Sequence, residues 1–350
     1  MNRETRGFSC PIPDTGGGDE ITLAHGEGGR LMRRLIRDAV LSRIDNEYLA
    51  PLGDAAILPG CRGALAMTTD SFVVSPLFFP GGDIGSLAVY GTANDLAVAG
   101  ARPRWISLAL IIEEGLPLAV LHRVVESIAQ AADRVQAQVV TGDTKVVPRG
   151  AADQLFINTA GVGEVFLSLP GPGSLQPGDA ILVSGPIGRH GIAVMASREG
   201  LAFEPPPTSD SGPLVDAVAA LSQAGVPVRA LRDATRGGLG AVLHEWARAS
   251  NLTLCFDEGD VPVPPEVRGA CELLGLDAVH VANEGTMVLA VPPQAATAAL
   301  DALRQLPECA GAARIGHVRP RALAPVIVRR ALGPEMPLDE PLGAPLPRIC

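Results

Sequence analysis

Apolar and polar positions follow two different periods along this chain of 350 residues. In the stretch 29–43, Leu31, Leu35, Ile36 and Val40 recur at helical spacing, which predicts a basic amphipathic helix with these side chains on its inner face. Elsewhere, short continuous apolar runs are bounded by glycine and proline, a pattern typical of buried strands. The sequence therefore predicts a mixture of helices and buried strands.

Strands and helices alternate in both halves of the chain. In the first half, strands are expected over 63–69, 106–112, 138–140 and 155–165, and helices over 85–99 and 117–135. In the second half, strands are expected over 180–184, 252–257, 286–291 and 325–329, and helices over 213–224, 238–249 and 293–306. This order predicts an α/β or α+β protein, with sheets that carry helices on one face.

A connection rich in proline and glycine, over 169–179, separates the two halves. We therefore expect a disordered N-terminal segment, a first domain, a second α+β domain and a proline-rich tail, over 1–24, 25–168, 169–331 and 332–350 respectively.

Composition narrows the class of protein. The hydrophobic content of 47% supports two substantial cores, which must consist of Ala, Val, Leu and Ile because only 3% of the residues are aromatic. A formal net charge of −10 and the lack of a Lys/Arg run argue against a nucleic-acid surface. No apolar stretch approaches the roughly 18 residues of a membrane span, and the N-terminal region lacks the apolar core of a signal peptide.

The six cysteines are scattered, without a CxxC pair or the ligand spacing of a zinc site. This argues against both a zinc centre and a disulfide scaffold. A reduced, cytoplasmic protein is expected.

Carboxylates beside small residues are the main candidates for chemistry. Such motifs are GDAA with Asp54, TTDS with Asp70, TAND with Asn94 and Asp95, GDTK with Asp143, and DATRGG with Asp233. Small neighbours let backbone amides approach a ligand, and carboxylates are preferred ligands of Mg²⁺. Any one of these aspartates is more simply a turn residue or a helix cap. Taken together, these aspartates predict a site that holds metal ions bound to the triphosphate of a nucleotide. Because GxxxxGK[ST] and GxGxxG motifs are absent, an ATP site would rest on metal and aspartates.

Four further residues are candidates for binding or proton transfer. Lys145 is the only lysine of the chain, and its amine can release a proton, which a guanidinium effectively cannot. Arg236 precedes two glycines at a helix start, where it either clamps phosphate oxygens or merely accompanies a capped helix. Glu284 of the NEG motif is either an acid–base group or a turn carboxylate, and His25 lies in the glycine loop HGEGG.

The tail, LGPEMPLDEPLGAPLPRIC, contains five prolines in nineteen positions and ends in Cys350. Such a stretch cannot continue a helix or form a central strand. As a polyproline-like arm it would span about 55 to 60 Å and carry its thiol from one site to another. The alternative is a frayed terminus that happens to end in cysteine.

These motifs occur in an order that resembles the aminoimidazole-ribonucleotide-synthetase superfamily of ATP-dependent enzymes. The segments GDAA, TTDS, GTANDLAVAGARP, TGDTKVV and DATRGG carry this resemblance. Within the superfamily, HGEGG, DSFVVSPLFFPGGDIG, CELLGLD, ANEG and the terminal PRIC look like the HypE family of hydrogenase maturation proteins. The resemblance covers about residue 23 to the end of the chain. It implies a two-domain α+β fold of the aminoimidazole-ribonucleotide-synthetase type with a flexible C-terminal tail, and ATP and Mg²⁺ as cofactors.

The resemblance also implies a reaction. A partner carbamoyltransferase, HypF, would load a carbamoyl group onto the sulfur of Cys350. The protein would then use ATP to dehydrate this group to a thiocyanate, as a carbamoyl dehydratase. The cyanide would pass to iron on the HypC–HypD complex, for the active site of a nickel–iron hydrogenase. The superfamily commonly dimerises through its first-domain sheets, so a homodimer is expected.

Carried over position by position, the resemblance assigns a metal–nucleotide set and a catalytic set. The metal-binding aspartates would be Asp54, Asp70, Asp95 and Asp143, with Asn94, Asp233 and Arg236 around the phosphates. The catalytic groups would be Cys350, Lys145, Glu284 and His25. Our hypothesis gives Glu284 the role of proton acceptor and Lys145 the role of stabilising charge at the carboxamide oxygen.

Other functions stay open at this point. A selenophosphate synthetase or a thiamin-phosphate kinase has the same fold and uses ATP, but neither needs a C-terminal cysteine. A non-catalytic scaffold for hydrogenase assembly would use Cys350 only as a ligand or docking thiol.

Overall fold

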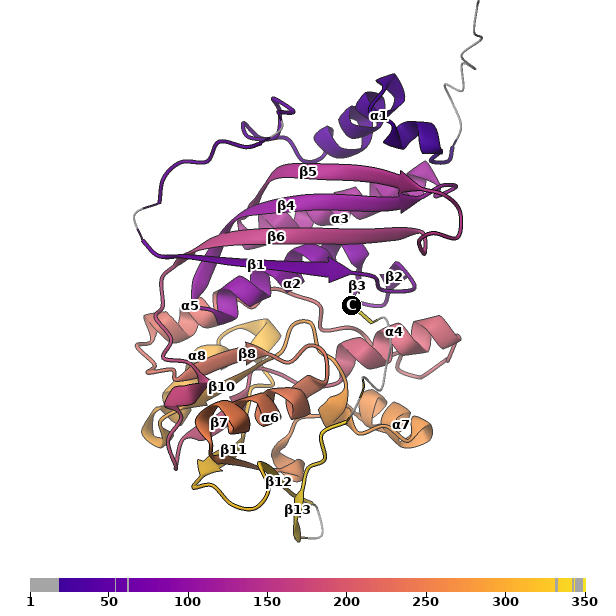
Figure 1. Cartoon of the computed structure of the whole chain (residues 1–350). Helices are drawn as coiled ribbons and strands as arrows, with labels where there is room; N and C mark the ends of the chain where they lie inside the picture. Colours follow the sequence, from indigo (N-terminus) through magenta and orange to yellow (C-terminus); the bar gives the residue numbers. More distant parts are fainter. Residues whose placement is uncertain (1–18, 54, 62, 331–332, 342, 344–348) are drawn as a thin grey trace, which may run out of the picture.

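The computed structural model describes residues 19–53, 55–61, 63–330, 333–341, 343 and 349–350. These residues form two α+β domains, one above the other in Figure 1. The predicted fold class is therefore confirmed.

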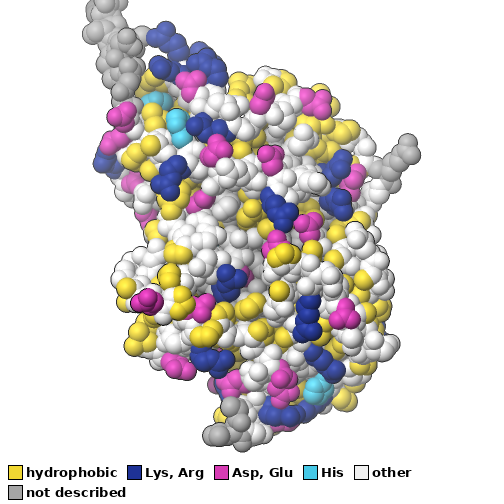
Figure 2. Space-filling model, turned by 180° about the vertical axis from the view of Figure 1, so that it is seen from behind, with side chains coloured by type: hydrophobic (Ala, Val, Ile, Leu, Met, Phe, Trp, Pro, Cys, Tyr) yellow, Lys and Arg dark blue, Asp and Glu magenta, His cyan; other side chains and the backbone are white. Residues whose placement is uncertain are grey.

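No helix within these ranges is both long and apolar enough to cross a membrane. Seen from behind, acidic and basic side chains are interspersed over the surface (Figure 2), so that face presents no continuous basic surface.

The first domain is built on a four-stranded sheet, as far as the chain is described, with strand order β1-β6-β4-β5. Its strands are β1 (Leu65–Phe72), β4 (Ala101–Glu113), β5 (Gln138–Val147) and β6 (Leu155–Val165). The β4–β5 pair is parallel and the other pairs are antiparallel. Helices α2 (Ile84–Val98) and α3 (Leu118–Val135) cover one face, and shorter elements flank it: η1 (Leu23–Gly26), α1 (Arg30–Leu35), the π-helical turn η2 (Ile36–Leu41), β2 (Phe78–Phe79) and β3 (Gly82–Asp83).

In the second domain the described strands form a seven-stranded sheet of order β13-β12-β9-β11-β7-β10-β8. These strands are β7 (Ala180–Val183), β8 (Ala230–Asp233), β9 (Thr253–Asp257), β10 (Met287–Val291), β11 (Ala313–Arg319), β12 (Val326–Arg329) and β13 (Glu335–Pro337). The α-helices are α4 (Arg189–Glu199), α5 (Val215–Gln223), α6 (Gly238–Ser250), α7 (Pro265–Leu274) and α8 (Ala296–Arg304). The 3₁₀ turns are η3 (Pro172–Ser174), η4 (Glu258–Asp260), η5 (Ala278–His280), η6 (Pro293–Ala295) and η7 (Pro307–Cys309).

Helix α2 joins the two domains. It packs against β1, β4 and β6 on one side and against α5 and β8 on the other. Of its 15 residues, 12 are buried, and apolar residues surround the helix on all sides. A helix that is hydrophobic all round is stable only when it is enclosed, so the two domains share this helix as a common core.

Several expected boundaries were wrong. Residues 19–24 are not disordered, because Ile21 is fully buried and its N–H donates to the Leu116 carbonyl at 2.8 Å. Strand β5 does not end at residue 140 but continues to Val147, so the GDTK motif lies within a strand instead of after one. The helix expected over 29–43 divides into α1 and η2. Among the described strands and α-helices, seven were not predicted from the sequence: β2, β3, β8, β11, β13, α4 and α7.

The first part of the tail is anchored to the second domain, contrary to the expected free arm. Strand β13 pairs with β12, and Leu338 is buried in the hydrophobic core of the second domain. The guanidinium of Arg248 then binds Glu340 with two hydrogen bonds of 2.6 and 3.0 Å. Only the chain beyond Glu340 therefore connects this anchor to Cys350, which amounts to ten residues or about 31 Å of polyproline-like chain.

Gly238, the first residue of α6, has to be glycine for two reasons. Its φ is +61°, and a Cβ there would lie 2.5 Å from the Val281 carbonyl oxygen. We expect Gly238→Ala to lower the free energy of unfolding by about 2 kcal/mol or more, since steric overlap adds to the backbone strain. Gly200→Ala is the matched control, because Gly200 has a similar φ of +63° with open space around it. Denaturant unfolding of both variants measures the difference, and equal losses would contradict the predicted overlap.

Candidate active site between the domains

Cys350 lies between the two domains, near β3 and α4 (Figure 1). Its main-chain oxygen accepts a hydrogen bond of 3.2 Å from the Val73 N–H, directly after β1. Its thiol is hydrogen-bonded to Arg236, and the charges of Glu284 and Asp70 act on it. Burial, and next the charge of Glu284, raise the pKa of this thiol to about 12. The thiol is therefore protonated at neutral pH in this position.

Glu284 is the most deeply buried acid of the site, with 4% of its surface exposed. It lies in the turn before β10, whose backbone is held by Asp210: the carboxylate accepts from the N–H groups of Glu284 and Gly285, both at 3.1 Å. Burial, and then the charges of Asp233 and three other aspartates, raise the pKa of Glu284 well above its usual range. A raised pKa makes this carboxylate a stronger base than an exposed glutamate.

Three aspartates accompany Glu284. Asp70 lies on β1, Asp95 on α2 and Asp233 at the end of β8. Thr68 donates to Asp95 at 2.7 Å, and Arg236 approaches Asp70 at 3.7 Å. Burial and the charge of Asp95 raise the pKa of Asp233 to about 6. One of its carboxylate oxygens is buried and has no hydrogen-bond partner among the described residues.

This acidic set fits a bound cation. The buried Asp233 oxygen lies 3.9 Å from Arg232 Nε, too far for a hydrogen bond, and a buried carboxylate oxygen without a hydrogen bond is costly unless a ligand satisfies it. In the described part of the chain, no three His, Cys, Asp or Glu side chains converge closely enough to hold a metal ion by themselves. That pattern is compatible with Mg²⁺, which binds protein through one or two carboxylates and takes its other ligands from water and phosphates. Asp54 lies outside the described residues.

The structure does not bring Asp143 and Lys145 to this site within one chain. They form an ion pair with each other at 3.4 Å on the edge strand β5. Their register partners on β4 are Ala109 and Ile111, whereas Asp70 pairs with the buried Thr159. They therefore lie on the face of the sheet away from α2 and α3, three strand spacings or about 14 Å from β1. Within one chain Lys145 therefore lies away from Cys350, and its charge-stabilising role at the carboxamide stays a prediction.

Two other candidates have local structural tasks. Both amide protons of Asn94 are donated, to the carbonyls of Gly212 and Glu284 at 3.0 and 3.2 Å. No donor is left for a phosphate, so Asn94 supports the site without facing the nucleotide. The Nδ1 atom of His25 accepts from Thr22 N at 3.0 Å and helps to cap η1.

Sequence reasoning missed Asp210 and His190. Asp210 positions the Glu284 turn from a Thr-Ser-Asp-Ser-Gly segment without regular structure, a composition that by itself indicated only a loop. His190 is fully buried on α4, and its Nε2 atom lies 2.5 Å from the main-chain oxygen of Ile349. A lone histidine in a helix gave no signal for this contact.

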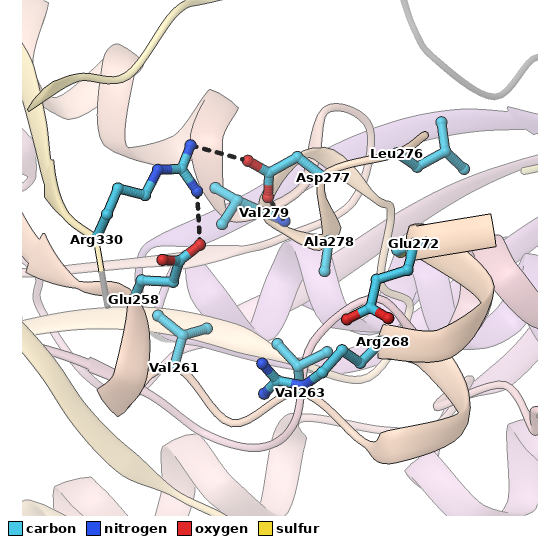
Figure 3. A pocket seen from close by; sticks show the side chains of 11 residues that line it. Glu258, Val261, Val263, Arg268, Glu272, Leu276, Asp277, Ala278, Val279 and Arg330 are labelled. Carbon is cyan, nitrogen blue, oxygen red and sulfur yellow. Dashed lines mark hydrogen bonds and ion pairs between the residues drawn. The ribbon is translucent and has the colours of Figure 1, made fainter. Parts of the chain in front are cut away.

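A cavity of about 290 Å³ in the second domain lies apart from these groups. Figure 3 shows Arg330 between Glu258 and Asp277, with hydrogen bonds of 2.6 and 3.4 Å. None of the candidate site residues lines this cavity. Glu258 and Asp277 hold Arg330, which directly follows β12, close to the start of the tail.

The raised pKa of Asp233 predicts a change in stability with pH. Because the folded pKa of about 6 exceeds the unfolded value of 3.8, the cost of ionising Asp233 is absent below pH 3.8 and complete above pH 6. Without nucleotide, Asp233→Asn should therefore gain up to about 3 kcal/mol of unfolding free energy at pH 8 and almost nothing at pH 4. Asp301→Asn, on an exposed position of α8, is the control. Thermal unfolding at the two pH values measures the gain, and an equal gain at both would contradict the assignment.

Comparisons with known proteins identify the family. The model "AIR synthase related protein, N-terminal domain" matches residues 52–165, and the corresponding C-terminal domain matches residues 176–328. The carbamoyl dehydratase HypE of Bradyrhizobium diazoefficiens is 48% identical over 332 residues, which cover 94% of this chain and 96% of that protein.

Solved structures agree with these matches. A crystal structure of the hydrogenase maturation protein HypE in complex with ATP superimposes with a TM-score of 0.90 at 46% identity, covering 94% of this chain and 99% of that chain. A chain of a HypE–HypF complex superimposes with a TM-score of 0.76 at 41% identity, covering 89% and 100%. Nearly half of all residues are thus shared with HypE proteins over almost the whole length, and the chain belongs to the HypE family of AIR synthase related proteins.

Proposed function

We propose that this protein is an ATP-dependent carbamoyl dehydratase that converts an S-carbamoyl group on its own Cys350 to a thiocyanate. The thiocyanate then supplies the cyanide ligand of a nickel–iron hydrogenase. The position of Cys350 carries the proposal: a terminal thiol is enclosed between two domains, beside Glu284 and Arg236. A frayed terminus or a simple docking thiol has no reason to be seated among groups that suit proton transfer and phosphate binding.

The reaction balances as a dehydration driven by phosphoryl transfer. The carboxamide oxygen attacks the γ-phosphorus of ATP, the bond to the β–γ bridging oxygen breaks, and ADP leaves. The O-phosphorylated imidate then loses phosphate by cleavage of its C–O bond. Its nitrogen gives up both protons as the C≡N bond forms; one leaves with hydrogen phosphate and the other is released to solvent.

The residues of the site divide these tasks. Glu284 is the proton acceptor, since a buried carboxylate of raised pKa is a stronger base than an ordinary glutamate. Arg236, with 68% of its side chain exposed, stays mobile enough to bind phosphate oxygens. Asp70, Asp95 and Asp233 would hold Mg²⁺, which neutralises phosphate charge when bound. Asp54 keeps its predicted role in binding metal and nucleotide, and His25 keeps its predicted place among the catalytic groups.

Two partner proteins follow from this chemistry. A carbamoyltransferase has to load Cys350, and HypF is the proposed partner because a related HypE was crystallised with it. The HypC–HypD complex is the proposed cyanide acceptor. We place the protein in the cytoplasm, where the buried free thiols Cys255, Cys271 and Cys309 remain reduced.

A homodimer would explain the position of Lys145. The sheet face that carries it also exposes Leu65, Met67 and Ile111, with exposed fractions of 53%, 74% and 38%. An apolar sheet face without a covering layer is typical of an interface. Packing two such faces together would bring the partner's Lys145 toward a second copy, so we assign its charge-stabilising role to the partner's site.

Mass spectrometry of the C-terminal peptide tests the reaction. With HypF, carbamoyl phosphate and ATP-Mg²⁺, we expect a carbamoyl adduct on Cys350 that loses one water, whereas the adduct should persist once ATP is removed. ATP turnover in this system should also disappear in Cys350→Ala. ATP binding without turnover would instead support a non-catalytic scaffold.

Mixed dimers test the assignment of Lys145. Lys145→Ala lacks the amine, and Cys350→Ala lacks the thiol, so each variant alone should form little or no thiocyanate. After equimolar mixing and subunit exchange, about half of the Lys145→Ala chains pair with a partner that retains Lys145. These chains should regain dehydration of their preloaded Cys350. A mixture as inactive as Lys145→Ala alone would contradict action across the dimer, and full activity of Lys145→Ala would exclude any role in the reaction.

A further inference from the structure

His190 makes an unusual contact for a buried histidine. It lies on α4 with none of its surface exposed, and the edge of the Phe79 ring packs on it at 5.3 Å between centroids. Its Nδ1 atom lies 2.9 Å from Ser209 Oγ, and its Nε2 atom lies 2.5 Å from the main-chain oxygen of Ile349. The penultimate residue of the chain is thus bound by a side chain from the second domain.

The hydrogen-bond network around His190 fixes which ring nitrogen carries the proton. Ser211 N–H donates to Ser209 Oγ at 3.0 Å. The single hydroxyl proton of Ser209 is then free to donate to Nδ1, which leaves Nε2–H to donate to the Ile349 carbonyl. Burial lowers the pKa of His190, which keeps the ring in this neutral form. The imidazole is therefore oriented as a donor toward the tail.

Two more contacts hold the same dipeptide. The side chain of Ile349 is 5% exposed and belongs to the core shared by both domains. On the other side of Cys350, its main-chain oxygen accepts from Val73 N–H of the first domain at 3.2 Å. Cys350 is thus bound through the main chain on both sides of its Cα atom, by one domain on each side.

We propose that His190, oriented by Ser209, is the positioning residue that binds the penultimate carbonyl of the tail and so fixes Cys350 Sγ beside Glu284 and Arg236. The Val73 N–H and the apolar core that buries the Ile349 side chain, here called the socket, complete a receptor for the C-terminal dipeptide. The consequence for catalysis rests on the proposed function, whereas docking of the dipeptide does not.

This receptor suits a tail that changes its chemical load. His190 and Val73 bind main-chain oxygens, and the socket binds Ile349, so none of the three contacts involves the sulfur substituent. The same contacts would hold a thiol, a thiocarbamate or a thiocyanate. One neutral buried hydrogen bond contributes about tenfold to such an equilibrium, enough to set the register of the tail while still permitting its release.

Alkylation of Cys350 measures docking without ATP or partner proteins. We compare iodoacetamide modification of Cys350 by peptide mass spectrometry, with Cys61 as the internal reference. His190→Phe keeps an aromatic ring against Phe79 but has no donor, so alkylation of Cys350 should rise about tenfold. His190→Gln can still donate from its amide and should stay within about threefold of the native rate. His122→Gln, on the remote helix α3, is the control and should leave the rate unchanged.

A change on the tail keeps the test valid if His190 variants fail to fold. Ile349→Ala leaves both domains intact and should also accelerate alkylation of Cys350. Acceleration by Ile349→Ala but not by His190→Phe would overturn the role of His190. Native rates in both variants would overturn docking of the dipeptide altogether.

A peptide assay then tests positioning in the reaction. Tail peptides carrying S-carbamoyl cysteine are supplied to the protein shortened after Glu340, whose receptor is not filled by its own tail, with or without His190→Phe. Loss of register should raise KM with a smaller fall in kcat, and His190→Gln should restore KM. An unchanged KM would contradict positioning. If no peptide is dehydrated by any protein while the alkylation differences persist, the proposed function fails and the receptor stands.

Discussion

The burial of α2 between two sheets is the constraint from which the site follows. A helix enclosed on all sides cannot leave its polar side chains to water, so each must find a partner inside the protein. Thr92 bonds Thr159 of the first-domain sheet at 2.5 Å, and Asn94 reaches the backbone of Glu284 in the second domain. Through Asn94, the helix that closes the interface also holds the turn that presents Glu284. Glu284, the proposed proton acceptor, is therefore positioned by the same packing that joins the domains.

That packing has an electrostatic cost. Burial, and next the charges of Asp233, Asp210, Asp70 and Asp95, raise the pKa of Glu284. Within the described residues, Arg236 is the cation that meets both Asp70 and the thiol of Cys350, and it is largely exposed. A concentration of carboxylates with so little counter-charge is stable in a fold only if the site is built to receive cations. Nucleotide-bound Mg²⁺ meets that requirement.

The sequence predicted the members of the site better than their arrangement. The small neighbours pointed to Asp70, Asp95, Asp233, Arg236 and Glu284. Of these, Asp70, Arg236 and Glu284 act on the thiol of Cys350, and Asp95 and Asp233 act on Glu284. Asp143 and Lys145 carry an equally clear motif, but a register shift between β4 and β5 intervenes, after Ile106 on β4 and Val139 on β5. A one-residue shift in a strand exchanges the two faces of a sheet, and the motif gives no sign of it. Asp210 and His190 were missed because they act on main-chain groups, which any sequence provides.

The anchored tail limits where chemistry on Cys350 can take place. With Leu338 in the core and Glu340 held by Arg248, only about 31 Å of chain separates the anchor from the thiol. That length lets Cys350 leave the interdomain site but not travel to a distant partner. A carbamoyl donor and a cyanide acceptor must therefore approach the same side of the second domain. Since both would compete for one short segment, they are expected to act in turn. The dipeptide receptor then separates their visits, because a docked tail is withheld from either partner while the sulfur substituent is being dehydrated.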